Sequence, residues 1–126
     1  MYEISAFGHF DAAHFLRGYP GKCANIHGHR WKVEITLQGV NLNQLGILID
    51  FMEVKRMLKE VVDMFDHKMI NDVPPFDSLN PTAENITKFV FDEMSGRLKS
   101  LTGDSIGITR VTVWESDAAC AAYYLD

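Results

Sequence analysis

The chain has 126 residues, a length that suits one domain with one core, and we expect a single domain over residues 1–126. Its formal net charge is -5, which argues against nucleic acid as a partner because phosphate binding needs basic surfaces. No stretch reaches the length of a membrane span, and the N-terminus lacks a basic segment followed by an apolar run. We therefore expect a cytoplasmic protein with reduced cysteines and no membrane partner.

The alternation of apolar and polar residues predicts two strands, over residues 2–14 and 27–39. Side chains on a strand point to opposite faces in turn, so one parity of each strand faces the core. Three polar residues occupy that apolar parity: His14 in the first strand, and His27 and His29 in the second. A buried polar group needs a partner, so these histidines are candidates for a site.

Helical periodicity predicts a first helix over residues 50–67. Asp50 followed three residues later by Glu53 resembles a capping box at its start. The apolar stripe of this helix is expected to consist of Phe51, Val54, Leu58, Val61 and Phe65.

A second amphipathic helix is predicted over residues 81–101, after a loop rich in turn residues. Thr82 is the expected N-cap, and Glu84 in the first turn suits the helix dipole. The expected apolar stripe consists of Ile86, Val90, Met94, Leu98 and Leu101.

Two further strands are predicted over residues 107–116 and 118–125, and Glu115 lies on the inward parity of the first. The order β-β-α-α-β-β, with strands in hairpins and helices between them, predicts an α+β fold. We expect an antiparallel four-stranded sheet with two helices packed on one face. Such a sheet has open edges, which favour association with copies of the same chain.

The spacing of the histidines favours a metal site. His27 and His29 share a strand face, and His14 joins them if the two strands are neighbours. Three imidazoles and one open position are typical of catalytic zinc, whereas structural zinc is usually closed by cysteines. The alternative is that each histidine is a hydrogen-bonded core residue.

Several other polar residues leave more than one interpretation open. Cys23 is a fourth metal ligand, a thiolate base beside the metal, or a small buried hydrophobe. Asp66 and His67 form either a proton relay or a helix end favoured by the dipole. Glu115 either binds a ligand by accepting two hydrogen bonds from paired N–H donors, or it forms an ion pair with a nearby cation.

These residues together resemble the 6-pyruvoyl-tetrahydropterin synthase family, and within it the bacterial 6-carboxy-tetrahydropterin synthase branch of the queuosine pathway. The resemblance covers nearly the whole chain. The Cys-x3-His-Gly-His spacing is similar to that branch. The matching segments are FDAAH at 10–14, CANIHGH at 23–29, GILIDFMEVK at 46–55, FDHKMIND at 65–72, NPTAEN at 80–85 and WES at 114–116.

The resemblance implies roles for individual residues. The metal would be zinc, held by His14, His27 and His29. The residues implied in proton transfer are Cys23 as proton acceptor, Asp66 and His67 as the relay, and Glu115 as a catalytic carboxylate that also anchors the pterin.

Further residues are expected to bind the substrate. Thr82 and Ala83 belong to the NPTAEN segment, which the resemblance places at the substrate. The triphosphate needs cations, and Arg17 and Lys22 lie near the matching segments.

The implied fold is the tunnelling fold, in which three subunits join their sheets into a barrel, two trimers stack into a homohexamer, and active sites fall between subunits. The implied reaction converts 7,8-dihydroneopterin triphosphate and water to 6-carboxy-5,6,7,8-tetrahydropterin, acetaldehyde and triphosphate. One alternative is a 6-pyruvoyl-tetrahydropterin synthase acting on the same substrate. The other is a non-enzymatic zinc-binding oligomer in which Cys23 closes the metal shell.

Overall fold

Five strands, two α-helices and two short 3₁₀ helices make up the computed structural model, which describes all 126 residues. The strands are β1 (Tyr2–His14), β2 (His27–Gly39), β3 (Lys68–Met69), β4 (Ile106–Ser116) and β5 (Ala119–Tyr124). The helices are α1 (Phe51–Val62) and α2 (Ala83–Thr102), and the 3₁₀ helices are η1 (Lys22–Ala24) and η2 (Ile70–Asp72).

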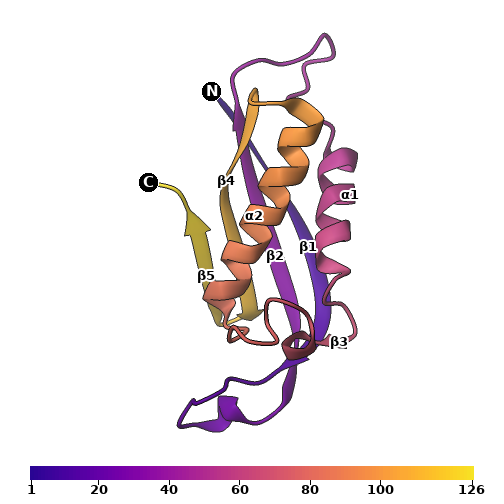
Figure 1. Cartoon of the computed structure of the whole chain (residues 1–126). Helices are drawn as coiled ribbons and strands as arrows, with labels where there is room; N and C mark the ends of the chain where they lie inside the picture. Colours follow the sequence, from indigo (N-terminus) through magenta and orange to yellow (C-terminus); the bar gives the residue numbers. More distant parts are fainter.

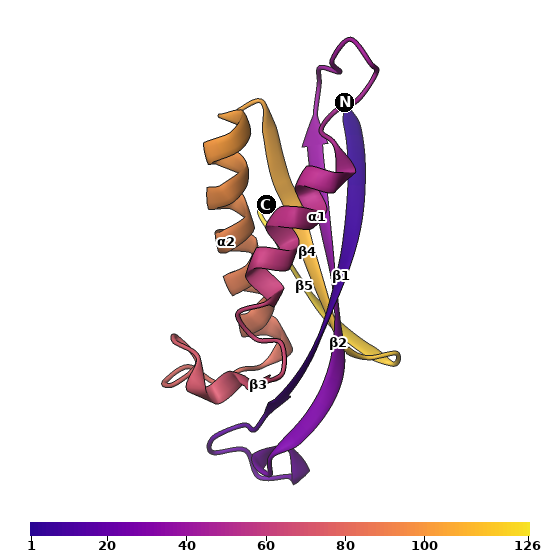
Figure 2. The ribbon, with the colours of Figure 1, turned by 90° about the vertical axis from the view of Figure 1, so that its right-hand side faces the viewer.

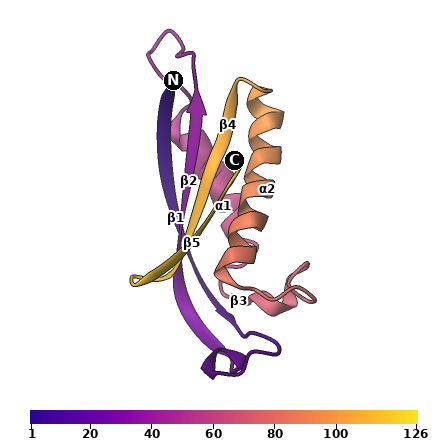
Figure 3. The same cartoon turned by 90° about the vertical axis from the view of Figure 1, so that its left-hand side faces the viewer.

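The strands form one sheet in the order β3-β1-β2-β4-β5, and both α-helices cover the same face of it (Figure 1). Figure 2 shows the two layers edge-on, with α1 and α2 on one side and the long strands on the other. The opposite sheet face carries no helix, and the β4–β5 hairpin projects away from the helix layer (Figure 3). None of the helices has the length and apolarity to cross a membrane. The α+β class with both helices on one face is thus confirmed.

The expected count of four strands is wrong by one. A two-residue strand, β3, pairs in parallel with Ala12 and Ala13 of β1, whereas the other pairings are antiparallel. So short a strand has no room for an alternating pattern, and the sequence contains no periodic signal for it. It fixes the segment after α1 against the end of β1.

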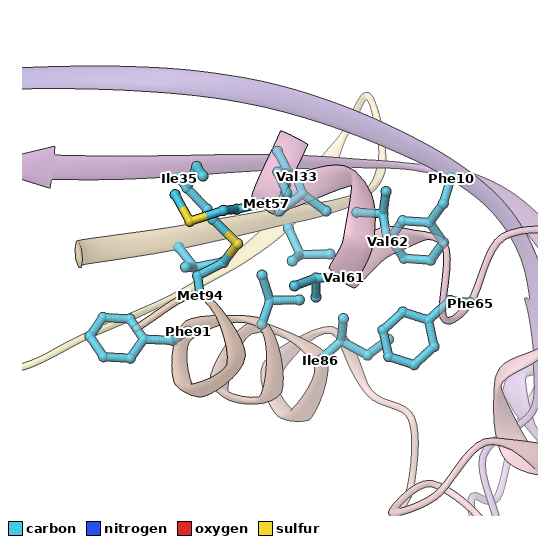
Figure 4. Close-up of a cluster of buried hydrophobic side chains, with 14 of the residues drawn as sticks. Phe10, Val33, Ile35, Met57, Val61, Val62, Phe65, Ile86, Phe91 and Met94 are labelled. Atoms are coloured by element: carbon cyan, nitrogen blue, oxygen red, sulfur yellow. The ribbon is translucent and has the colours of Figure 1, made fainter. Parts of the chain in front are cut away.

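The core fills the space between the helices and the inward parity of β1, β2 and β4. Trp31, Val33, Ile35 and Leu37 of β2 are all fully buried, because this strand lies in the middle of the sheet. Figure 4 shows side chains from both helices and from the sheet meeting there, with Phe10 and Phe65 at one end. Burial of these apolar surfaces is the main term that holds the layers together.

The helix ends partly differ from expectation. The side chain of Asp50 caps α1 by accepting from Met52 N, but Glu53 pairs with Arg56 and does not complete a capping box. The α1 helix ends at Val62, before the expected end at residue 67.

The apolar stripes also need correction at their ends. Phe51 is 50% exposed and Leu101 is 48% exposed, so neither belongs to the core. Both lie in a terminal turn of a helix, Phe51 at the start of α1 and Leu101 near the end of α2.

Leucines at two positions of α2 test this description of the core. We expect Leu98→Ala to lower the free energy of unfolding by about 2–5 kcal/mol, because Leu98 is 1% exposed and its loss leaves a cavity. Leu101→Ala makes the same chemical change in the same helix and should cost less than about 1 kcal/mol. Urea unfolding measures both, and equal costs would contradict the placement of the core boundary.

Candidate active site

The register between β1 and β2 gathers the three histidines at one end of the sheet. His14, the last residue of β1, lies directly opposite His27, the first residue of β2, and Ala12 lies opposite His29. Because alternate residues of a strand share a face, the rings of His27 and His29 point the same way. The three ring centroids lie between 4.5 and 5.4 Å from one another. The structure therefore brings together the histidines that the parity singled out.

Glu115 reaches the same point from β4, the other neighbour of β2. Its Oε1 lies 3.0 Å from Nε2 of His14, 3.1 Å from Nε2 of His29 and 3.9 Å from Nε2 of His27. The ligand atoms of these four residues all lie within 4.8 Å of one another, and we call them the four-residue metal group.

Backbone carbonyls fix the tautomers of two rings. Nδ1 of His14 lies 2.8 Å from the carbonyl oxygen of Pro81, and Nδ1 of His27 lies 2.6 Å from that of Asn25. A carbonyl oxygen only accepts, so each Nδ1 is the donor and the Nε2 of each neutral ring carries a lone pair. Both lone pairs face Oε1 of Glu115, which is also an acceptor. Only a proton or a cation between these atoms satisfies all of them.

The third histidine supports the same conclusion. Nε2 of His29 is buried and makes no hydrogen bond, because its 3.1 Å approach to Oε1 of Glu115 lacks hydrogen-bond geometry. A buried polar nitrogen without a partner costs free energy unless another group satisfies it. A metal ion at the centre of the group would provide that partner.

Burial keeps His14 in the form that binds metals. Desolvation lowers the pKa of the His14 imidazole, although the Pro81 carbonyl and Glu115 act in the opposite direction. The ring is therefore neutral near neutral pH, as a metal-binding imidazole must be. Trp31 packs edge-on against His14 at 4.9 Å and against His29 at 5.5 Å, which limits ring rotation.

The spacing of the group fits a small divalent ion. Ligand atoms at about 2.0–2.1 Å from a tetrahedral ion are about 3.3 Å apart, and the three Oε1–Nε2 distances of 3.0, 3.1 and 3.9 Å bracket that value. Tethering of the imidazoles through Nδ1 is also what metal-binding histidines show in their outer shell. The four residues could therefore hold a metal ion.

Cys23 lies outside this group but borders a hollow next to it. Cys23 lies in η1, and its Sγ is not one of the ligand atoms of the four-residue metal group. The hollow has a volume of about 430 Å³ and is lined by His14 and Glu115 on one side and Cys23 on another. We call it the cysteine hollow.

Among the residues expected at the substrate, Thr82, Ala83 and Arg17 line the cysteine hollow, whereas Lys22 is exposed and does not. The guanidinium of Arg17 donates to the carbonyl oxygens of Phe76, Leu79 and Asn71 at 2.9, 3.4 and 3.5 Å. Most of its hydrogen-bonding capacity is thus used within the chain.

Two asparagines hold the wall of this hollow in place. They lie in the matching segments FDHKMIND and NPTAEN, but the sequence alone gives them no role. Asn71 accepts from the backbone N–H of Phe15 and donates to the carbonyl of the same residue, both at 3.0 Å. Asn80 does the same with Arg17, at 2.8 and 3.0 Å. Their side-chain amides replace the ladder bonds that a neighbouring strand would make. A burial pattern does not reveal this role, because it depends on which distant backbone the amide meets.

Glu84 also lines the hollow, although the sequence pattern indicates only a favourable interaction between its carboxylate and the helix dipole. It lines the cysteine hollow in the first turn of α2, which Thr82 caps by accepting from Asn85 N at 3.1 Å. The Glu84 carboxylate makes no hydrogen bond or ion pair within the chain. Its position directly after Thr82 and Ala83 in the NPTAEN segment is the signal that could have identified it.

Asp66 and His67 lie in the turn between α1 and β3, not at a helix end. Oδ2 of Asp66 is 3.0 Å from Nδ1 of His67, and Oδ1 accepts from Asp11 N at 2.9 Å. The Asp11 N–H first, and then His67, hold the pKa of Asp66 below its ordinary value. His67 has a φ of 58° and its side chain is 79% exposed, so an ionised carboxylate aims an imidazole into solvent. Neither residue lines the cysteine hollow of its own chain.

Comparison with known proteins identifies the family of this chain. Residues 3–126 match the family model of 6-pyruvoyl tetrahydropterin synthase. The chain is 34% identical to the putative 6-carboxy-5,6,7,8-tetrahydropterin synthase of Archaeoglobus fulgidus, over 86% of this chain and 83% of that protein. It is 32% identical to the 6-carboxy-5,6,7,8-tetrahydropterin synthase of Haemophilus influenzae, over 98% and 99% of the two chains.

A solved structure shows the same fold. The 6-pyruvoyl tetrahydropterin synthase of Caenorhabditis elegans superimposes with a TM-score of 0.84 at 24% identity, over 99% of this chain and 96% of that one. The match of the family model over almost the whole length, together with these relatives, shows that the chain belongs to the 6-pyruvoyl tetrahydropterin synthase family.

Proposed function

We propose that the protein is a zinc-dependent lyase that converts 7,8-dihydroneopterin triphosphate and water to 6-carboxy-5,6,7,8-tetrahydropterin, acetaldehyde and triphosphate, as a cytoplasmic step of queuosine biosynthesis. The observation that supports it most is the convergence of three Nε2 atoms and one carboxylate beside a hollow bordered by Cys23. The names of the two relatives and the Cys-x3-His-Gly-His spacing favour the 6-carboxy product.

The chain supplies the metal site through His14, His27 and His29. Zinc, when bound, supplies a Lewis acid that polarises the oxygens of the substrate side chain and acidifies the neighbouring C–H. The carbonyls of Pro81 and Asn25 keep the lone pairs of His14 and His27 directed at this point.

Cys23 is the proposed proton acceptor. It borders the same hollow as His14 and Glu115 without belonging to the metal group, so its sulfur is available to the substrate. A thiolate near cationic groups is a competent base. Arg17 borders the same hollow as Cys23, and Lys22 precedes Cys23 in the chain. That Arg17 and Lys22 also bind the triphosphate stays a prediction, and the carbonyl bonds of Arg17 favour a structural role for it.

The proposed relay of Asp66 and His67 requires a second subunit. Asp66 stays ionised and orients His67, whose exposed imidazole does not line the cysteine hollow of its own chain. The sheet also leaves most of β1 and the outer side of β5 without a neighbouring strand. We propose that these edges join in a hexamer of two trimers and that His67 serves the site of a neighbouring subunit.

Two carboxylates border the hollow, and both are candidates for the N–H edge of the pterin. Oε1 of Glu115 already faces the three imidazoles, which leaves one oxygen of this carboxylate for the substrate. Glu84 has both oxygens free and lies beside Thr82 and Ala83. We propose that Glu84 makes the paired contact with the pterin and that Glu115 acts between the metal and the substrate.

Product analysis tests the proposed function. The zinc-loaded protein is incubated with 7,8-dihydroneopterin triphosphate, and the small molecules are identified by mass spectrometry. The carboxy product together with acetaldehyde supports the proposal. A 6-pyruvoyl product without acetaldehyde favours the alternative synthase, and the absence of any turnover by the hexamer favours a non-enzymatic zinc-binding oligomer.

Single substitutions separate the base from the metal ligands. Cys23→Ala should lower turnover by about 10²- to 10⁴-fold and leave the zinc content unchanged, because the thiol lies outside the metal group. His29→Ala should lose zinc as well as activity. Zinc analysis of the purified variants, with Cys120→Ala as the matched control, measures both effects. Loss of zinc in Cys23→Ala would show that the sulfur is a ligand.

The low pKa of Asp66 predicts a dependence of stability on pH. A carboxyl whose folded-state pKa lies below the unfolded value stabilises the fold above that value, and the contribution is lost as pH falls through the folded pKa. Asp66→Asn should therefore unfold at lower urea concentration than the unsubstituted protein at neutral pH. This difference should shrink as the pH falls below 3.8, the ordinary pKa of an aspartate carboxyl. Asp77→Asn is the control, because the Asp77 side chain is exposed and makes no hydrogen bond or ion pair within the chain. A difference that persists at low pH would contradict the ionised pair.

A further inference from the structure

A second hollow lies next to the metal group, and its wall includes residues of the sheet face that carries no helix. Figures 2 and 3 show this sheet face. Its volume is about 710 Å³, and His29 and Glu115 form part of its wall. The basic residues of the wall are His9, Arg30 and Lys32. We call it the basic hollow.

The alternation along β2 places these cations beside the metal group. His29 and Trp31 point to the helix side of the sheet, whereas Arg30 and Lys32 have the opposite parity. One strand thus supplies metal ligands to one face and cations to the other. Glu115 borders both the basic hollow and the cysteine hollow, so the two meet at the metal group.

Lys32 is held in place without being neutralised. Its Nζ lies 4.5 Å from the ring centroid of Phe7 and 4.7 Å from that of Trp114, which come from the strands on either side. Aromatic faces attract an ammonium but leave its full charge available. Although Lys32 is half-buried, no carboxylate of the chain lies within ion-pair distance of Nζ. A fixed cation without a counter-ion is suited to bind an anion.

The other charges of the basic hollow do not cancel this one. Arg30 pairs with Asp11 at 3.3 Å, but both side chains are exposed, and such a pair exchanges easily for a stronger anion. Glu115 faces the imidazoles, where a divalent ion would more than offset its charge. The remaining carboxylate is Asp117, which lies in the turn between β4 and β5.

We propose that the basic hollow binds the triphosphate group of the substrate through Lys32 and Arg30. This inference rests on the proposed function and assigns a place to the part of the substrate that Arg17 and Lys22 were expected to hold. A ligand whose side-chain oxygens lie at the metal group would direct its pterin toward Cys23 and its phosphates past Glu115 into the basic hollow. The missing side chain of Gly28 leaves the wall open there, since a Cβ at this position would meet only the Ala12 carbonyl, at 3.9 Å.

Binding of inorganic tripolyphosphate tests the inference without turnover. Isothermal titration calorimetry on the zinc-loaded hexamer should show binding that weakens with added salt. Lys32→Met should weaken it about tenfold, since the variant removes the charge and keeps an unbranched chain between the rings. Lys32→Arg should retain most of the affinity. Lys55→Met, which removes an exposed lysine of α1, should bind like the unsubstituted protein. Zinc content before and after titration excludes removal of zinc by the polyphosphate.

The result that overturns the inference is equal tripolyphosphate affinity in Lys32→Met and the unsubstituted protein, or a loss in Lys22→Met alone. Kinetics give a second measurement: Lys32→Met should raise KM for the triphosphate substrate more than it lowers kcat. Binding of 7,8-dihydroneopterin, which lacks phosphates, should not change in this variant. If tripolyphosphate binds as expected but no pterin product forms, the proposed function fails and the anion site stands.

Discussion

The site depends on one electrostatic constraint, which is that acceptor atoms of two imidazoles and a carboxylate meet at one point. Two backbone carbonyls occupy the N–H sides of His14 and His27, so their remaining nitrogens face each other and a carboxylate as acceptors. Such an arrangement is unfavourable unless a positive charge lies at its centre. The rest of the structure near the site keeps these atoms in this position.

The supports of that arrangement come from distant parts of the chain. The β1–β2 register places His14 directly opposite His27, and Trp31 packs against the rings of His14 and His29 and limits their rotation. The carbonyl that orients His14 belongs to Pro81, in the segment that Asn80 attaches to the backbone of Arg17. Loosening this attachment would disturb the metal site without touching a ligand. The wall of the cysteine hollow and the metal group are therefore held in place by the same hydrogen bonds.

Much of this could be predicted from the sequence, because strand and helix periods are strong where burial is one-sided. The polar residues on apolar parity, His14, His27, His29 and Glu115, mark the metal group directly. Other features carry no such mark. The β3 strand is too short for a pattern, and the roles of Asn71 and Asn80 depend on a backbone more than fifty residues away.

The position of Asp66 and His67 shows a different limit. Their chemistry as a pair follows from adjacency in the sequence, but the turn that points His67 outward depends on a left-handed backbone and on Asp11 of another element. No local pattern contains that information, because a non-glycine residue rarely adopts such a φ.

The double use of β2 constrains how this strand can change during evolution. Because its two faces serve different chemistry, an insertion or deletion of a single residue between Gly28 and Lys32 would exchange the imidazole side with the ammonium side. The one irregularity in the pairing of β2 with β4 lies between Thr36 and Leu37, beyond this stretch. Insertions and deletions in natural variants should therefore occur in the second half of β2 and not among its first six residues.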